Sequence, residues 1–200
     1  ANAADQSHNT MTSNKNFCAG TGQSGDGSQL RIFQKVVPGT EYTSADIQNR
    51  SFVFHQLGIG ATNEWRYGAG SIDATGQITI TSDTAPSGPG QTGPTGAIVS
   101  VNGSGIVTKS DDASFQGFLS DDKKTIVATE SRGTTHRLTI LQISGQTYTA
   151  GPLPAGISAA HMLGCGGAPA PFWVHYTATV ASGGVITIGD WVTSNAAIVP

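Results

Sequence analysis

Leu30-Arg-Ile-Phe-Gln34 returns later in the chain as Leu138-Thr-Ile-Leu-Gln142, and each of these segments opens a longer stretch that occurs twice. The offset between the two copies is 108 residues at Leu30, 106 at His55 and 108 at Trp65, so the differences in length fall in the connecting loops. The other matched segments are Phe54–Gly58 with Ala160–Gly164, Trp65–Ile72 with Trp173–Val180, and Gly76–Ile80 with Gly184–Ile188. Self-similarity at a fixed period predicts a duplicated structural unit.

The matched segments and those around them have the pattern of short β-strands. From Leu30 onward the hydrophobic period is two, and Gly, Asn, Asp and Pro separate the runs. We expect strands near residues 29–36, 51–57, 65–73, 77–82, 97–101, 105–109, 113–119, 124–130, 137–143, 157–163, 172–180 and 185–193. The sequence therefore predicts an all-β fold, an antiparallel sandwich or barrel of about ten to twelve strands built from a duplicated four-strand unit.

The domain organisation follows from the same pattern. A single β domain is expected over residues 29–200, and its parts are a repeat unit over 29–83, middle strands over 97–130 and a repeat unit over 137–193. Residues 1–28 are polar and lack apolar alternation, which predicts an N-terminal arm. Thr84–Gly96 holds three prolines and four glycines and predicts a long surface loop, because proline supplies no donor to a strand ladder.

Composition and charge exclude several classes of partner. Only 12% of the 200 residues are charged, and the net charge is −3. Nucleic-acid binding requires a basic face, which this balance does not supply. The chain also has no run of eighteen apolar residues, so no helical membrane insertion is expected. The opening Ala1-Asn-Ala-Ala4, without Met, predicts a processed chain that is secreted to the exterior or the cell surface.

Two cysteines, Cys18 and Cys165, stand far apart and form no Cys-x-x-Cys motif. In a secreted chain the simplest outcome is one disulfide between them, and the alternative is a pair of unrelated buried thiols.

His55 and His161 hold equivalent positions in the two copies, and each is followed by a Gly-containing loop and a tryptophan, Trp65 or Trp173. A pseudo-twofold arrangement would give these corners related surroundings, as a site for a sugar or a small ligand requires. The alternative, which we favour, is structural: each histidine bonds a backbone carbonyl, and each tryptophan plugs the end of the β core. No metal site is predicted, because a third and fourth ligand at recognisable spacing are missing.

Three further residues are candidates for an assembly interface. Trp191 corresponds to Asp83 in the first copy, so the repeat does not require a tryptophan there. Tryptophans that a fold does not demand are often used at interfaces. Met11 and Phe17 are apolar anchors in the otherwise polar N-terminal segment.

Catalysis has little support in this sequence. The chain has no Gly-x-Ser-x-Gly, no His-Glu-x-x-His, and no Walker or dinucleotide glycine pattern. We therefore expect no enzyme activity and no cofactor.

Two functions from different classes remain. The first is a non-catalytic secreted structural subunit that self-assembles into an extracellular fibre or surface layer, with the N-terminal arm contacting a neighbouring copy. The second is a monomeric extracellular module that binds a carbohydrate, such as a surface glycan, or another small ligand at the two His/Gly-loop/Trp corners.

Overall fold

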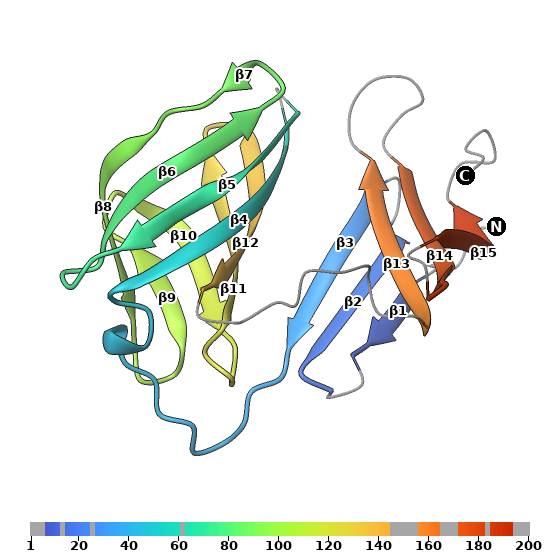
Figure 1. The fold of residues 1–200 in the computed structure, drawn as a ribbon, viewed down its shortest axis with the longest axis horizontal. Coiled ribbons are helices and arrows are strands. Elements are labelled where there is room, and N and C mark those ends of the chain that lie inside the picture. Colours follow the sequence, from blue (N-terminus) through green and yellow to red (C-terminus); the bar gives the residue numbers. More distant parts are fainter. Residues whose placement is uncertain are drawn as a thin grey trace. The chain divides into compact units, whose positions relative to one another are not determined.

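The structure is a computed structural model, and it describes residues 7–12, 15–24, 27–60, 63–144, 156–164, 172–182 and 185–193. The fold is nearly all β, as predicted (Figure 1). The chain divides into two compact units, residues 35–146 and residues 1–34 with 147–200, in contrast to the predicted single domain over 29–200.

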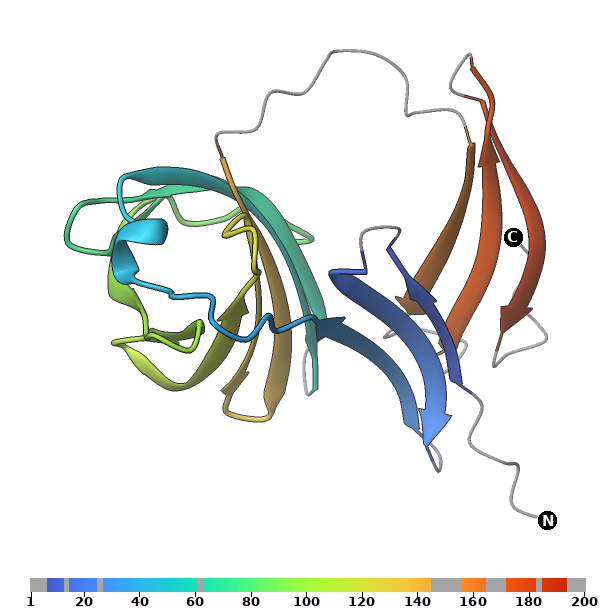
Figure 2. The same ribbon diagram turned by 90° about the horizontal axis from the view of Figure 1, so that it is seen from below.

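The unit over residues 35–146 is a closed eight-stranded antiparallel barrel with one extra strand, β7 (Figure 2). Its strands are β4 (Arg50–Ile59), β5 (Glu64–Ile72), β6 (Gln77–Ala85), β7 (Gly88–Pro89), β8 (Gly93–Val101), β9 (Ile106–Lys109), β10 (Asp112–Leu119), β11 (Thr125–Arg132) and β12 (Thr135–Ile143). The order around the barrel is β5-β4-β12-β11-β10-β9-β8-β6, and pairing of β5 with β6 closes the ring. Closure leaves none of these eight strands as an open edge.

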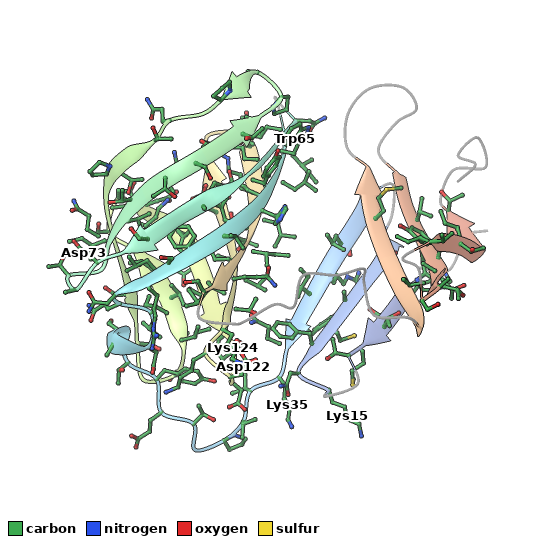
Figure 3. All side chains as sticks on the ribbon, viewed as in Figure 1. Lys15, Lys35, Trp65, Asp73, Asp122 and Lys124 are labelled. Carbon is green, nitrogen blue, oxygen red and sulfur yellow. The ribbon has the colours of Figure 1, made fainter. Side chains whose placement is uncertain are left out.

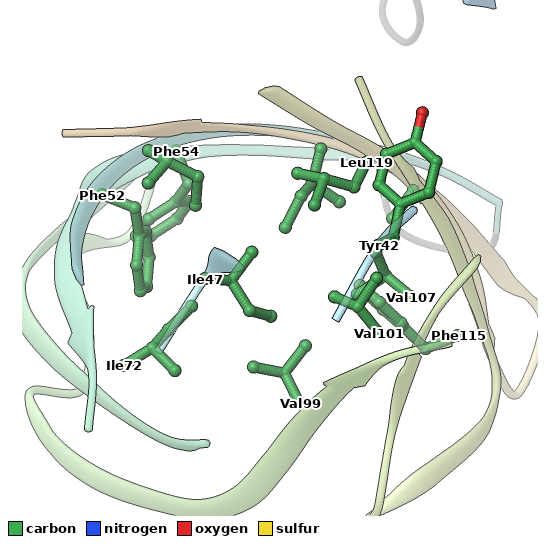
Figure 4. Close-up of a cluster of buried hydrophobic side chains, with 13 residues drawn as sticks. Tyr42, Ile47, Phe52, Phe54, Ile72, Val99, Val101, Val107, Phe115 and Leu119 are labelled. Atoms are coloured by element: carbon green, nitrogen blue, oxygen red, sulfur yellow. The ribbon is translucent and has the colours of Figure 1, made fainter. Parts of the chain in front are cut away.

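Side chains that point inward fill the barrel (Figure 4). Phe52 and Phe54 on β4, and Ala97, Val99 and Val101 on β8, are buried and alternate with exposed residues, as the two-residue period of a strand requires. The buried cluster consists of Tyr42, Ile47, Phe52, Phe54, Ile72, Val99, Val101, Val107, Phe115, Leu119, Ile126, Ala128 and Ile143. This barrel is therefore a packed core and does not hold an open channel through this region.

A short 3₁₀ helix, η1 (Ser44–Asp46), precedes β4. Ile47, the residue that follows this helix, is fully buried in the core. The helix begins with a capping box: the Thr43 backbone N–H donates to Asp46 Oδ2 at 2.8 Å. Lys123, from the β10–β11 turn, donates to the other oxygen of the same carboxylate at 2.9 Å. Asp46 thereby fastens the helix to the barrel.

The second unit contains two three-stranded antiparallel sheets. The first sheet has the order β1 (Ser7–Met11), β2 (Phe17–Ser24) and β3 (Gly27–Gln34). The second has the order β13 (Gly156–Gly164), β14 (Phe172–Val180) and β15 (Ile186–Thr193).

Three predictions require correction. Much of the expected N-terminal arm forms β1 and β2, because the backbone ladders of β1 with β2 and of β2 with β3 stabilise strands that have little apolar alternation. The expected four-strand unit is not one sheet: β3 pairs with β2, whereas β12, its counterpart in the second copy, pairs with β4 and β11. The expected loop over Thr84–Gly96 contains β7 and the start of β8, and Pro94 is accommodated next to an irregularity in the β6–β8 register.

The predicted disulfide is also not observed. Cys18 on β2 is a free, partly buried thiol. Its expected partner, Cys165, lies outside the described residues.

Residues of the first small sheet pair with each other in the same way as the residues 108 positions later pair in the barrel. In the first sheet Met11 pairs with Cys18 and Phe17 with Gln34; in the barrel the pairs 108 residues later are Leu119 with Ile126 and Thr125 with Gln142. The turns agree as well: Lys15 and Lys123 both have positive φ, at 60° and 59°.

The second small sheet resembles β4–β5–β6 in the same way. Leu163 pairs with Trp173 as Leu57 pairs with Trp65. The β5–β6 and β14–β15 ladders each contain a register shift, between Ala69 and Gly70 in one and between Tyr176 and Ala178 in the other.

Candidate functional site

A row of three rings lies on the outer face of β4 and β5. We call His55, Trp65 and Tyr67 the outer aromatic row. The Trp65 and Tyr67 rings are stacked, with 6.0 Å between centroids and 10° between planes, and the His55 ring lies 6.0 Å from that of Tyr67. Trp65 and Tyr67 are 46% and 48% exposed. These rings are accessible, in contrast to the predicted role of Trp65 as a plug of the core.

Local strand geometry explains this row. Residues two apart on a strand point to the same face, so Trp65 and Tyr67 share the outside of β5. Tyr67 pairs directly with His55 across the β4–β5 ladder, and Trp65 pairs with Leu57. Trp65 lies at one end of β5, and Asp73 lies beyond the other end (Figure 3).

The outer aromatic row continues into an apolar surface on the next strand. Ile140 pairs with His55 and Leu138 with Leu57 in the β12–β4 ladder, and these aliphatic side chains are partly buried. Stacked rings beside aliphatic groups and an imidazole suit a ligand that has both apolar faces and hydroxyl groups.

A second cluster lies on the inward side of the strands. Its members, which we call the inner ionic cluster, are Glu64, Arg66, Asp83, Lys109, Glu130 and Arg137. Glu130 accepts hydrogen bonds from Lys109 Nζ and from Arg137 Nη1, each at 3.1 Å. Arg137 Nε donates to Glu64 at 2.5 Å. Arg66 is paired with Asp83, whose side chain has no exposed area.

Burial and pairing act in opposite directions on these charges. Burial lowers the pKa of Arg137, but hydrogen bonds and charge attraction from Glu130 and Glu64 outweigh it and raise the pKa above its ordinary value. The Lys109 ammonium also lies 5.2 Å from the centroid of the Phe115 ring, where a cation–π interaction contributes. The inner ionic cluster is thus internally neutralised and fixed in position.

The duplicated strand pattern does not require charged residues at these positions, because the counterparts in the other copy are uncharged. The residues 108 positions from Glu64, Arg66 and Asp83 are Phe172, Val174 and Trp191. Likewise, Gly22 and Gln29 stand 108 positions before Glu130 and Arg137.

The remaining predicted ligand-site residues are placed only in part. His161 and Trp173 lie on β13 and β14, and their side chains fall outside the described residues. His161 pairs with His175, which holds the position of Tyr67 and stacks on His8 with 5.4 Å between ring centroids. The structure therefore brings His55 together with Trp65, and the missing member of that row in the sequence prediction was Tyr67.

The predicted interface residues lie on three strands of the second unit. Met11 at the end of β1 is 58% exposed, and Phe17 at the start of β2 is partly buried. Trp191 lies on β15, with its side chain outside the described residues.

The inner ionic cluster was not predicted from sequence. Glu64 and Arg66 alternate with Trp65 and Tyr67 along β5. This alternation indicates that one face of the strand is charged and the other aromatic. Alternation alone does not tell which face points into the barrel.

No group of three or more His, Cys, Asp or Glu side chains among the described residues is arranged to hold a metal ion. Within the same residues, no helix has the length and apolar character needed to cross a membrane.

Comparison with known proteins adds no further assignment: no protein-family model, no curated protein and no solved structure matches this chain.

Proposed function

We propose that this protein is a non-catalytic structural subunit, secreted from the cell, that assembles with copies of itself into an extracellular fibre or surface layer. The observation that carries the proposal is the strand register. Both small sheets repeat the pairing of the barrel at constant sequence offsets, down to the turn at Lys15 and the register shift in β14–β15.

The chain is, on this proposal, built from repeats of one barrel module of about 108 residues. Residues 35–146 form a whole module, and the two small sheets correspond to parts of modules of the same kind. Repeat proteins use such modules as spacers and assembly units, because each module contacts its neighbours in the same way.

The surface and the interior agree with a structural role. Charged residues are scarce, and the barrel interior is occupied by its own side chains. Met11 and Phe17 on the N-terminal sheet would take part in contacts between copies.

Negative-stain electron microscopy and light scattering test the proposal on the full chain and on residues 35–146 alone. We expect the full chain to form filaments or sheets and the isolated barrel to remain monomeric, because the barrel has no open strand edge among its eight strands. A full chain that stays monodisperse and monomeric at all concentrations would refute the structural function.

A second function is favoured by one specific observation, the exposed outer aromatic row. We propose that this row binds a carbohydrate, whose C–H faces stack on Trp65 and Tyr67 while its hydroxyls bond the imidazole of His55. The equivalent positions in the second copy hold Trp173, His175 and His161, which retains a ring at each place.

Glycan-array binding and tryptophan fluorescence titration test the second function. Trp65→Ala and Tyr67→Ala should each abolish binding, whereas Ile98→Ala, which removes a side chain that is also exposed, should leave it unchanged. Binding that survives both aromatic substitutions would place the glycan elsewhere.

A further inference from the structure

The inner faces of the two small sheets carry large apolar side chains that remain exposed. Met11 is 58% exposed and Phe33 is 54% exposed. The residues 108 positions later, Leu119 and Leu141, belong to the barrel core or pack against it, and Leu119 has no exposed area.

The C-terminal sheet shows the same contrast. Ile186 and Ile188 are 54% and 45% exposed. Their counterparts, Ile78 and Ile80, are partly buried against the core. On the same face of the C-terminal sheet, Val174, Ala178 and Val180 are buried, so each small sheet covers only part of its inward-type apolar face within its own unit.

The barrel also indicates which edge strands of the two small sheets would pair with each other. The counterpart of β3 is β12, and the counterpart of β13 is β4; β12 and β4 pair from His136 with Ile59 to Ile143 with Phe52. Yet β3 and β13 are the outermost strands of their sheets and pair with no strand on that side among the described residues. An open edge above an apolar face is a typical site for the addition of a further strand.

We infer that β3 of one copy pairs antiparallel with β13 of a second copy, so that the N-terminal sheet of one chain and the C-terminal sheet of the next form one continuous wall. The inference rests on the proposed structural function and names its contact. The second copy is the occupant because both sheets already lie in one compact unit of their own chain, and there β3 and β13 form no ladder with each other. Met11, Phe33, Ile186 and Ile188 stay exposed in that unit. A contact from the C-terminal sheet to the N-terminal sheet of the next chain is head-to-tail and can continue into a filament.

The barrel predicts the register of this contact. Thr139 pairs with Gln56 and Leu141 with Phe54. Subtracting 108 on the first strand and adding 106 on the second gives Arg31 opposite Met162 and Phe33 opposite Ala160. The Gln56 amide donates to Thr139 Oγ1 at 2.9 Å in the barrel, so side chains at this pair do face each other.

The same ladder shows that these pairs suit a disulfide. Ser144 N–H donates to Ser51 O at 2.7 Å, which marks that pair as hydrogen-bonded. Pair types alternate along an antiparallel ladder, so the positions of Thr139 and Leu141 belong to non-hydrogen-bonded pairs, with about 4.5 Å between Cα atoms. That separation lies within the range of disulfides.

Engineered cysteines test the inference in a Cys18→Ser/Cys165→Ser background of the full chain. The matched pairs are Arg31→Cys with Met162→Cys and Phe33→Cys with Ala160→Cys. The crossed pairs, Arg31→Cys with Ala160→Cys and Phe33→Cys with Met162→Cys, use the same four substitutions in the wrong register and serve as controls. Each pair is divided between two single-cysteine proteins that are mixed, oxidised mildly and run on a non-reducing gel.

We expect at least ten times more mixed dimer from the matched pairs than from the crossed pairs, and a ladder of multimers when both matched cysteines are in one chain. Equal yields from matched and crossed pairs would overturn the register. A matched double variant that closes only an internal disulfide, with no mixed dimer, would overturn the role of the second copy. The use of two matched pairs and circular dichroism of each variant separates a wrong register from a misfolded protein.

Failure of this inference is distinguishable from failure of the proposed function. Filaments of wild-type protein without matched cross-links would leave the structural function standing and reject the β3–β13 contact. Absence of any assembly in the wild-type protein would reject both.

Discussion

At the scale of single residues, the barrel depends on carboxylates that are held by several donors. Asp46 accepts from the Thr43 backbone and from Lys123, and it joins η1 to the β10–β11 turn. Burial raises the pKa of Asp46, but the hydrogen bonds to Lys123 and Thr43 outweigh it, so that its folded pKa lies below the ordinary value.

This lowered pKa predicts how stability depends on pH. The unfolded carboxyl takes up its proton at a higher pH than the folded one, so the stabilisation is complete above the unfolded pKa, about 3.9, and is lost as the pH falls through the folded pKa. We expect Asp46→Asn to lower the free energy of unfolding at pH 7 by about 1 kcal/mol, as is usual for the loss of a helix cap. Urea titrations at pH 7 and pH 3 check this; a difference between wild type and variant that grows toward acid pH would contradict the role of the charge.

Glu130 predicts a larger effect, because its side chain is only 4% exposed and it pairs with three cations, Lys109, Arg132 and Arg137. Glu130→Gln leaves Lys109 and Arg137 buried without their shared carboxylate, and breaking a buried pair in this way costs about 3 kcal/mol. Denaturant unfolding measures the loss, and Glu41→Gln, at an exposed carboxylate, is the control. Similar small losses in both variants would show that the inner ionic cluster does not support the fold.

At the scale of elements, turns and glycines determine how the strands connect. Gly76, between β5 and β6, has a φ of +89°, and a Cβ there would come 2.6 Å from the carbonyl oxygen of Val99. Gly103, in the β8–β9 turn, has no such φ and open space around it.

We expect Gly76→Ala to lower the free energy of unfolding by about 1–3 kcal/mol, because the left-handed backbone and the close carbonyl both oppose a side chain. Gly103→Ala should change it by less than about 0.5 kcal/mol. Thermal or urea unfolding of the two variants makes the comparison, and equal effects would argue against the importance of this turn.

At the scale of the whole molecule, residues 35–146 contain a closed set of eight paired strands with a core of their own. We expect this segment, expressed alone, to fold as a monomer and to unfold in one cooperative transition, since nothing outside it is needed to close the barrel. Circular dichroism and urea unfolding followed by two probes test this. Non-coincident transitions, or a molten segment, would show that the second unit is required.

Much of the secondary structure was predictable because it depends on local alternation. All twelve expected strands have a counterpart, and the turns at Asp73–Gly76 and Ser120–Lys124 connect strands as expected. β1 and β2 were missed, since their polar sequences show no apolar period; the backbone ladders of β1 with β2 and of β2 with β3 hold them instead.

The residues of the candidate sites were likewise predictable only where the signal is local in the sequence. The sequence by itself determined an all-β chain with a repeated pattern and marked His55 and Trp65, because strand period, turn residues and self-similarity are properties of neighbouring residues. Only the tertiary structure decided that β12 returns to β4 and that Trp65 and Tyr67 face outward. It also decided that Glu64, Glu130 and Arg137 meet inside the barrel and that Arg66 pairs with Asp83. The physical reason is that strand order, the inward or outward sense of a face, and ion pairs between distant strands depend on which strands pair, and hydrogen-bonded pairing carries no signal in the sequence of either strand alone.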